Sequence, residues 1–354
     1  MLTAHCLEVE AEATTPLALD PHSGSALRGA ILSALWERFC MNHEARSCYD
    51  CPLSEGCPIG SLVTPLRDED NSALRSHWRD RARPYIIRPP HGEGNESEAY
   101  RYAPGEMLTF GLTLLGSSLK LFPYVIRAFQ AMESLGLGRP LPELRGQRGS
   151  FRVREVRAFH PFTQERQVLW KGDGAPPQKP RVCITQADIT TRAHTLRADG
   201  ITMEFLSPTR LVRQQQVLRH PDFQTLLLRL AERFEQVLGA YGDHRDHLTD
   251  ASTPGVGRAW YLQIEAHAQE VRLAHDETRW IGLRSYSARQ RQLMPIDGFV
   301  GQASFVGDVA APLRELLVWG EVLHVGKSAT KGNGHYILET AKSASSPDVS
   351  VTPV

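Results

Sequence analysis

The stretch APLRELLVWGEVLHVGKSATKGNGHYIL, residues 311–338, decides how the chain is built. Its apolar spacing predicts a helix near 311–323, its glycines predict a turn, and HYIL predicts a final strand. The first half of the chain ends in the same order, with a helix near 118–135, the glycine-rich GLGRP and the strand FRVREVRAF. This weak internal repeat predicts two similar domains in tandem.

Each half also contains the elements that a complete domain needs before that ending. In the first half, an apolar strand at about 2–12 precedes an amphipathic helix, and PYIIRPP and MLTFGLTLLG read as two further strands. Strand, helix, strand, strand, helix, strand is the order of a ferredoxin-like fold. In the second half, we expect one helix with an apolar stripe through Phe223 and Leu238, and strands near 181–190, 200–206, 258–273, 279–288 and 297–307.

The predicted fold class is therefore α+β, with two tandem ferredoxin-like domains. The first covers residues 1–168 and carries a cysteine-rich insertion at about 40–60, after the first helix. The second covers 180–340 and contains the glycine-rich loop, and 341–354 is predicted to be a disordered tail.

Composition narrows the class of protein. Hydrophobic residues make up 41% and charged residues 23% of the 354 residues, as in folded globular proteins. The sequence has no apolar run of roughly 20 residues and no secretory signal at its start, so we expect a cytoplasmic protein without a membrane partner. Basic and acidic residues both number 40, and only 6 of the basic ones are lysines, leaving 34 arginines. Arginine suits phosphate contacts, although a GC-rich genome explains the same count.

The glycine-rich loop has the composition of a phosphate-binding turn. Gly326, Gly332 and Gly334 bracket Lys327 and Lys331, and glycines let successive backbone N–H groups approach a phosphate. The loop fits neither the P-loop pattern nor a dinucleotide fingerprint. On spacing alone, a structural turn is the alternative.

The segment from RSYSARQRQLMPIDGF to KGNGHYIL resembles the carboxy-terminal half of the CRISPR-associated endoribonuclease family that cuts precursor crRNA, a branch of the RAMP superfamily. The stretches SGSALRGAIL, RPYIIRPP, YAPGEMLTFGLTLLG and FLSPTRLV fit the same family. The resemblance implies two RAMP domains of the ferredoxin-like (RRM-like) type. It also implies metal-independent cleavage of CRISPR repeat RNA, in which the 2′-hydroxyl attacks the adjacent phosphate and leaves a 2′,3′-cyclic phosphate.

The resemblance leaves a second function open. A non-catalytic RAMP subunit would bind and cap crRNA without cutting it. In both cases CRISPR repeat RNA or crRNA is the expected partner, and other Cas subunits of an effector complex are further expected partners. A third hypothesis, an iron-sulfur protein that processes DNA, rests on the cysteines alone.

In the resembled family, catalytic groups lie in the loop before the first helix or at the far end of that helix. Those places hold His22 and His43, and imidazole suits proton transfer near neutral pH. A helix of about 16 residues separates them by about 24 Å, so we treat them as competitors. Tyr49 is a reserve candidate, and an ordinary loop histidine is the alternative for both.

Besides the glycine loop, further residues are candidate RNA contacts. Arginines interleaved with polar and aromatic residues can hold phosphates and stack on a base, although a solvated strand face explains the pattern too. These candidates are Arg28, Arg284, Arg289, Gln290 and Arg291.

Four cysteines, Cys40, Cys48, Cys51 and Cys57, follow the first helix with seven, two and five residues between them. In the cytoplasm, clustered thiols favour a metal over disulfides. The spacing is close to that of the four-iron, four-sulfur loop of endonuclease-III-like DNA glycosylases, and zinc is the other option. Four thiolate ligands leave zinc no open position for water, so we expect a structural site and no catalytic metal. Free cysteines in a compact loop are the alternative.

Overall fold

The computed structural model describes residues 1–48, 50–54, 56–63, 82–90, 99–172, 174–243, 257–287 and 292–340. The predicted tail at 341–354 lies outside these residues. The chain forms two compact units. Unit 1 contains Met1–Gln186, Glu235–Asp250 and Ser328–Gly332, and unit 2 contains Ala187–Phe234, Ala251–Lys327 and Asn333–Val354. Part of the glycine-rich loop therefore packs with the amino-terminal half.

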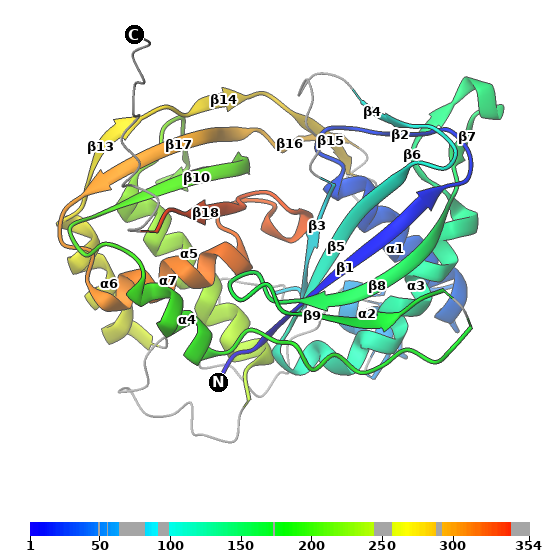
Figure 1. The fold of residues 1–354 in the computed structure, drawn as a ribbon, viewed down its shortest axis with the longest axis horizontal. Coiled ribbons are helices and arrows are strands. Elements are labelled where there is room, and N and C mark those ends of the chain that lie inside the picture. Colours follow the sequence, from blue (N-terminus) through cyan, green and yellow to red (C-terminus); the bar gives the residue numbers. More distant parts are fainter. Residues whose placement is uncertain are drawn as a thin grey trace, which may run out of the picture. The chain divides into compact units, whose positions relative to one another are not determined.

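Unit 1 is built on a five-stranded antiparallel sheet (Figure 1). Its strands lie in the order β3-β5-β1-β8-β9. Without the edge strand β9, this is the strand order of a ferredoxin-like domain, in which the first strand lies between the third and the fourth. The bounds are β1 (Ala4–Ala13), β3 (Tyr85–Arg88), β5 (Met107–Leu115), β8 (Phe151–Phe159) and β9 (Arg166–Trp170).

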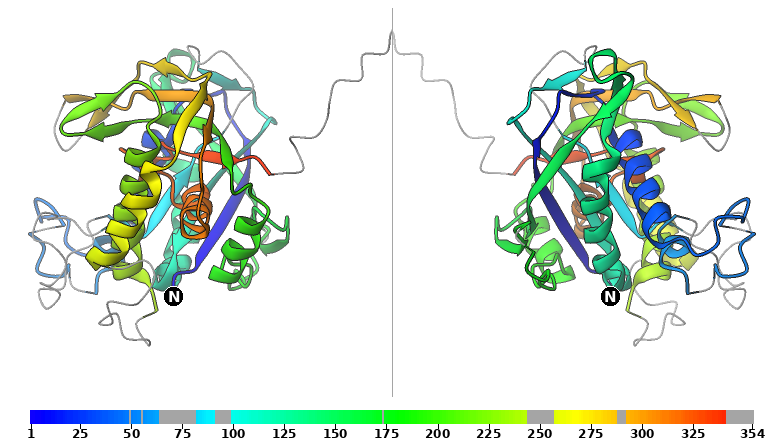
Figure 2. Two further views of the ribbon diagram at one scale, coloured as in Figure 1. Left: turned by 90° about the vertical axis from the view of Figure 1, so that its left-hand side faces the viewer. Right: turned by 90° about the vertical axis from the view of Figure 1, so that its right-hand side faces the viewer.

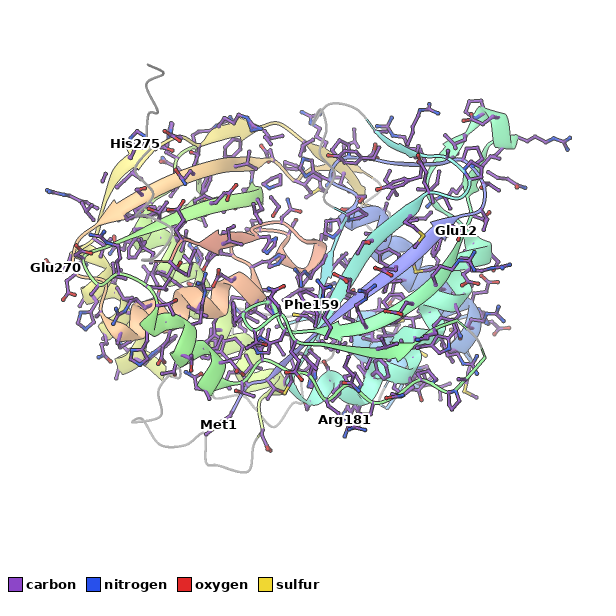
Figure 3. All side chains as sticks on the ribbon, viewed as in Figure 1. Met1, Glu12, Phe159, Arg181, Glu270 and His275 are labelled. Carbon is purple, nitrogen blue, oxygen red and sulfur yellow. The ribbon has the colours of Figure 1, made fainter. Side chains whose placement is uncertain are left out.

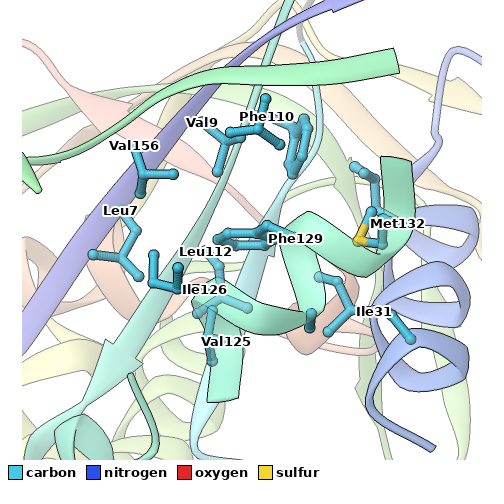
Figure 4. Packing of buried hydrophobic residues seen from close by; sticks show 14 of the residues in the cluster. Leu7, Val9, Ile31, Phe110, Leu112, Val125, Ile126, Phe129, Met132 and Val156 are labelled. Atoms are coloured by element: carbon cyan, nitrogen blue, oxygen red, sulfur yellow. The ribbon is translucent and has the colours of Figure 1, made fainter. Parts of the chain in front are cut away.

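Two helices, α1 (Gly24–Phe39) and α3 (Phe122–Leu135), cover one face of this sheet. Leu7, Val9 and Ala11 alternate along β1 and are fully buried, because every second side chain of a strand points to the same face. They pack with apolar side chains of both helices in one core (Figure 4). The core thus fixes the position of α1, on which two predicted sites depend.

Short elements complete unit 1. Strand β2 (Leu17–Leu19) pairs with β4 (Tyr100–Tyr102), and β6 (Leu137–Leu141) pairs with β7 (Gln147–Gly149). The short helices are α2 (Pro58–Val63), η1 (Gly116–Leu121), η2 (Pro142–Leu144) and η3 (Ala329–Lys331).

Unit 2 repeats the same plan. Its sheet has the order β13-β17-β10-β18, again with the first strand between the third and the fourth, and β14 also pairs with β17. Helices lie on one face of the sheet (Figure 2), where Phe234 of α5 contacts Trp319 of α7. The strands are β10 (Gly200–Thr209), β13 (Arg272–Asp276), β14 (Arg279–Ile281), β17 (Gly298–Val306) and β18 (Tyr336–Leu338). The helices are α4 (Gln186–His194), α5 (Phe223–Tyr241), α6 (Gly257–Gln269) and α7 (Ala311–Leu323). Two hairpins pair β11 (Leu211–Arg213) with β12 (Gln216–Leu218) and β15 (Arg284–Ser287) with β16 (Gln292–Pro295).

Two predicted strands are wrong. Residues 186–194 and 257–269 form α4 and α6, whereas strands were expected at 181–190 and 258–273. Each helix buries apolar residues four positions apart, Ile189 with Ala193 and Ile264 with Ala268, which is helical spacing. None of the helices in the described ranges has the length and hydropathy that crossing a membrane requires.

Candidate functional site

The segment Ser328–Gly332 of the glycine-rich loop packs in unit 1, against the amino-terminal end of α1. Gly24 begins α1 and lies directly under Lys331, because a Cβ added at Gly24 would overlap the carbonyl oxygen of Lys331. His22 lies two residues before Gly24. The structure thus brings Lys331 to the helix start that follows His22, although Gly24 and Lys331 are more than 300 residues apart in the sequence.

The other side of this segment contacts β3. A Cβ added at Gly332 would come within 2.6 Å of Pro89 Cδ and 2.9 Å of the Ile87 carbonyl oxygen. Gly332 also ends η3 with a φ of 94°, a conformation that side chains other than glycine rarely adopt. Close approach and backbone conformation therefore both require glycine at this position.

Three basic side chains gather where η3, α1 and β3 meet. Lys331 is partly buried, and burial lowers the pKa of its amino group, with further lowering from the charges of Arg28 and Arg83. Arg28 donates a hydrogen bond from Nε to Tyr85 Oη at 3.3 Å, and Arg83 donates one from Nε to the Val63 carbonyl oxygen at 3.3 Å. We call Arg28, Arg83 and Lys331 the basic cluster.

The electrostatics of the basic cluster suit an anion. Within the described residues, Lys331 forms no ion pair, and its two charged neighbours both repel it. A phosphate at this position would relieve that repulsion and favour the protonated amine. Of the two predicted histidines, His22 is the one closer in sequence to Gly24.

The remaining predicted glycines lie in unit 2. Gly326 and Gly334 have φ values of 79° and 70°. Lys327 is exposed, and its backbone N–H donates to the Arg210 carbonyl oxygen at 3.1 Å. Its ammonium group is therefore accessible, while its backbone is fixed.

Residues 203–336 match the family model described as CRISPR-associated endoribonuclease Cas6, and residues 2–181 match a family model described as an N-terminal domain. The carboxy-terminal half of the chain therefore matches the Cas6 family. The resemblance predicted from the glycine-rich segment is thus confirmed. No curated protein sequence matches the chain.

Solved structures share the fold of this protein. A Cas6 product complex is 15% identical and covers 95% of this chain and 100% of its own, with a TM-score of 0.51. The partial Cas6-RT-Cas1–Cas2 complex is 13% identical over 96% of this chain and 46% of its own, with a TM-score of 0.55. Thermus thermophilus Cas6 is 14% identical over 96% and 99%, with a TM-score of 0.49. The first two likenesses and the strand orders confirm the predicted α+β class with tandem ferredoxin-like domains.

His43 lies in a different environment from His22. It follows the carboxy-terminal end of α1, is exposed, and packs edge-on against Trp36 with ring centroids 4.3 Å apart. Since α1 has 16 residues, its two ends are about 24 Å apart. The structure therefore does not bring the two predicted histidines together.

Several other predicted residues are separate or outside the described ranges. Arg284 is exposed at the start of β15. Tyr49 and the run Arg289, Gln290 and Arg291 lie outside the described residues. Tyr85, which the sequence did not single out, joins the basic cluster through Arg28, and only its tertiary position reveals this.

The four cysteines do not form a metal centre in this structure. Among the described residues, which include all four, no three histidine, cysteine, aspartate or glutamate side chains are grouped to hold a metal. Cys40, Cys48 and Cys57 are partly buried against the core of unit 1, and Cys51 accepts a hydrogen bond from Asn42 Nδ2 at 3.7 Å. The described side chains therefore show no group that would hold zinc or an iron-sulfur cluster, and we derive no chemistry from one. The metal stays a prediction from the cysteine spacing.

Proposed function

We propose that this protein binds CRISPR repeat RNA and cleaves precursor crRNA at the basic cluster. The match of residues 203–336 to the Cas6 endoribonuclease family supports an RNA-cleaving enzyme. The single observation that carries the location is the position of Lys331 beside the start of α1, which places three cations next to the helix end that His22 precedes by two residues.

The proposed reaction is an internal transfer within the RNA. The 2′-oxygen attacks the adjacent phosphorus, the bond from phosphorus to the 5′-oxygen breaks, and a 2′,3′-cyclic phosphate and a 5′-hydroxyl result. One group must remove the proton of the 2′-hydroxyl, and another must protonate the leaving 5′-oxygen. The phosphorane also gains negative charge, which fixed cations stabilise.

We assign one proton transfer to His22 and the stabilisation of charge to Lys331 and Arg28. The ordinary pKa of imidazole, about 6.5, allows it to accept or donate a proton near neutral pH. The arginine suits bidentate contact with a phosphate, and the lysine acts as a point charge. Because side chains supply these roles, the proposed reaction requires no catalytic metal.

His43 is the competing assignment. Its ring is exposed at the far end of α1. No residue of the basic cluster lies close to His43 in the sequence. If repeat RNA were cleaved at this end of the helix, cleavage would take place at a distance from Lys331. The two assignments differ in which variant loses the chemical step, so a direct comparison separates them.

Cleavage of labelled repeat RNA in EDTA tests this proposal. We expect wild type to cut the RNA and to leave a cyclic phosphate. His22→Ala should lower the rate of cleavage by at least about 100-fold, as removal of a general acid or base does. His43→Ala should retain the wild-type rate of cleavage. Lys331→Arg should keep binding. The reverse loss, in His43→Ala alone, would overturn the assignment.

The rival function is a RAMP subunit that binds crRNA without cutting it. Binding of repeat RNA by wild type with no cleavage in any buffer would establish that function. A product that stays bound after cleavage would support the further proposal that the protein retains crRNA and joins other Cas subunits. Size exclusion with the labelled product distinguishes retention from release.

A further inference from the structure

A groove lies on unit 1 between α3 and the linker that follows β9. It has a main lobe of about 700 Å³, lined on one side by residues of η1 and α3 and on the other by the linker at 174–179. A second lobe of about 500 Å³ shares Arg127, Gln130, Trp170 and Gly174 with the first. The two lobes therefore form one continuous groove.

The linker is fastened to the sheet at both of its ends. Gln178 donates its backbone N–H to the Leu169 carbonyl oxygen at 2.8 Å, and Arg181 donates its own to Gln167 Oε1 at 2.7 Å. At the other end, a Cβ at Gly172 would lie 2.8 Å from the Val153 carbonyl oxygen. Figure 3 marks Arg181, where the linker ends. These contacts make the linker a fixed wall of the groove.

Basic side chains dominate the lining of the groove. Six cations face one carboxylate, although the whole chain has a formal net charge of +0. The cations are Lys120, Arg127, Arg152, Arg154, Lys171 and Lys179. Such a concentration of one sign in a neutral protein indicates an anionic ligand.

Existing contacts neutralise little of this charge. The one carboxylate, Glu133, accepts the backbone N–H of Val153 at 2.8 Å. Arg154 pairs with Glu12, marked in Figure 3, through Nε at 2.7 Å. The other five cations have no carboxylate partner among the described residues; Asp173, in the same linker, lies outside them. The groove is therefore open to a ligand that carries several negative charges.

The groove is separate from the basic cluster. It lies at the β9 edge of the sheet, whereas the cluster lies at the β3 edge, four strand positions away in the order β3-β5-β1-β8-β9. With about 4.8 Å between neighbouring strands, the two edges are roughly 19 Å apart. A single short segment of RNA cannot occupy both.

We propose that this groove binds single-stranded RNA next to the repeat element that the basic cluster holds. The two walls carry cations from α3 and from the linker, as a groove that follows a sugar-phosphate backbone requires. Phe122, Pro123 and Ile126 add apolar surface for sugars and bases. Lobes of about 700 and 500 Å³ are within the size range of pockets that hold a small ligand such as a nucleotide. The identity of the RNA rests on the proposed function; the charge of the groove does not.

The test compares two RNAs, a minimal repeat hairpin and the same hairpin with single-stranded extensions. The variant combines Lys120→Ala, Arg127→Ala and Lys171→Ala. Its matched control removes three exposed cations of unit 1 outside the groove, with Arg101→Ala, Arg145→Asn and Arg148→Ala. Affinity is measured over a range of salt concentrations, and thermal unfolding shows that both variants fold.

We expect wild type to bind the extended RNA more tightly than the hairpin, and only the groove variant to lose this difference. For three lost phosphate contacts, the salt slope for extended RNA should fall by about 2. Cleavage of the hairpin should not change. An equal loss of affinity for both RNAs, or an equal loss of affinity in the control variant, would overturn the proposal. Displacement of the extension by polyglutamate would also overturn it, because that result would indicate an acidic protein segment as the ligand.

Failure of the two proposals can be told apart. If wild type does not cut the hairpin but still gains affinity from the extension, the endoribonuclease proposal fails and the groove stands. If it cuts the hairpin and gains nothing from the extension, the groove proposal fails alone.

Discussion

Replacing Lys331 by methionine should make the protein more stable and a weaker RNA binder. In the free protein, burial and the charges of Arg28 and Arg83 lower the pKa of Lys331, so the folded state disfavours its charged form. Methionine removes that penalty while keeping a chain of similar length. The free energy of unfolding at neutral pH should therefore rise, although most substitutions lower it.

The loss in binding follows from one phosphate contact. A hydrogen bond to a charged group contributes about 1.5–3 kcal/mol, which corresponds to an affinity lower by about 10- to 150-fold. The salt slope with single-stranded RNA should fall by about 0.7. Fluorescence anisotropy with repeat RNA measures both quantities, and thermal unfolding measures stability.

The sign of the pH dependence is also fixed. Because the pKa of Lys331 lies below its ordinary 10.5, the unfolded chain binds more protons between the two values, and stability rises with pH there. RNA favours the charged amine, so affinity should fall as pH rises through the lowered pKa. Lys331→Arg is the control that retains binding at high pH. Unchanged affinity in Lys331→Met, or a large loss of stability, would refute the reasoning.

Three further predictions concern other parts of the chain. Burial lowers the pKa of His5 below 6.5, so the free energy of unfolding should decrease as the pH is lowered below 6.5. Urea unfolding at pH 5 and 7 should show a smaller decrease for His5→Gln than for wild type, and an equal decrease in both proteins would contradict this. Glu321→Ala should lower the free energy of unfolding by about 3 kcal/mol, because Arg192, 3.3 Å away and largely buried, loses its carboxylate partner while its hydrogen bond to the Leu338 carbonyl oxygen remains. Asp199→Asn, at an exposed pair, should change the free energy of unfolding little. If the four cysteines hold a metal, elemental analysis should find iron or zinc. Cys51→Ser should then lose the metal and impair cleavage by disturbing the loop that follows α1. Metal-free protein that cuts normally would contradict this prediction.

Much of the fold follows from local patterns in the sequence. Alternation along β1 and β8 and the apolar stripe of α1 predict those elements, since each buries only one face. The repeat of helix, glycine turn and strand predicts the tandem plan. The run AWYLQIEAHAQ was misassigned because aromatic and β-branched residues favour strands, while burial of Ile264 and Ala268 selects a helix.

The site was less accessible to sequence reasoning. The sequence singles out His22, Arg28 and Lys331 as candidates, but nothing local indicates that Lys331 lies against Gly24. That contact depends on the tertiary fold, because Ser328–Gly332 belongs to unit 1 whereas the strand that follows it belongs to unit 2. The same holds for the groove, whose cations come from η1, α3, β8 and the linker after β9.

We propose above that this protein cuts RNA through the RNA's own 2′-hydroxyl. The most direct test of this proposal is a repeat RNA with a single 2′-deoxy nucleotide immediately 5′ of the mapped scissile phosphate, incubated with wild type in EDTA. The account predicts unchanged affinity and no cleavage, beside a cyclic-phosphate product from the unmodified RNA. Cleavage of the deoxy RNA at the same phosphate would contradict it.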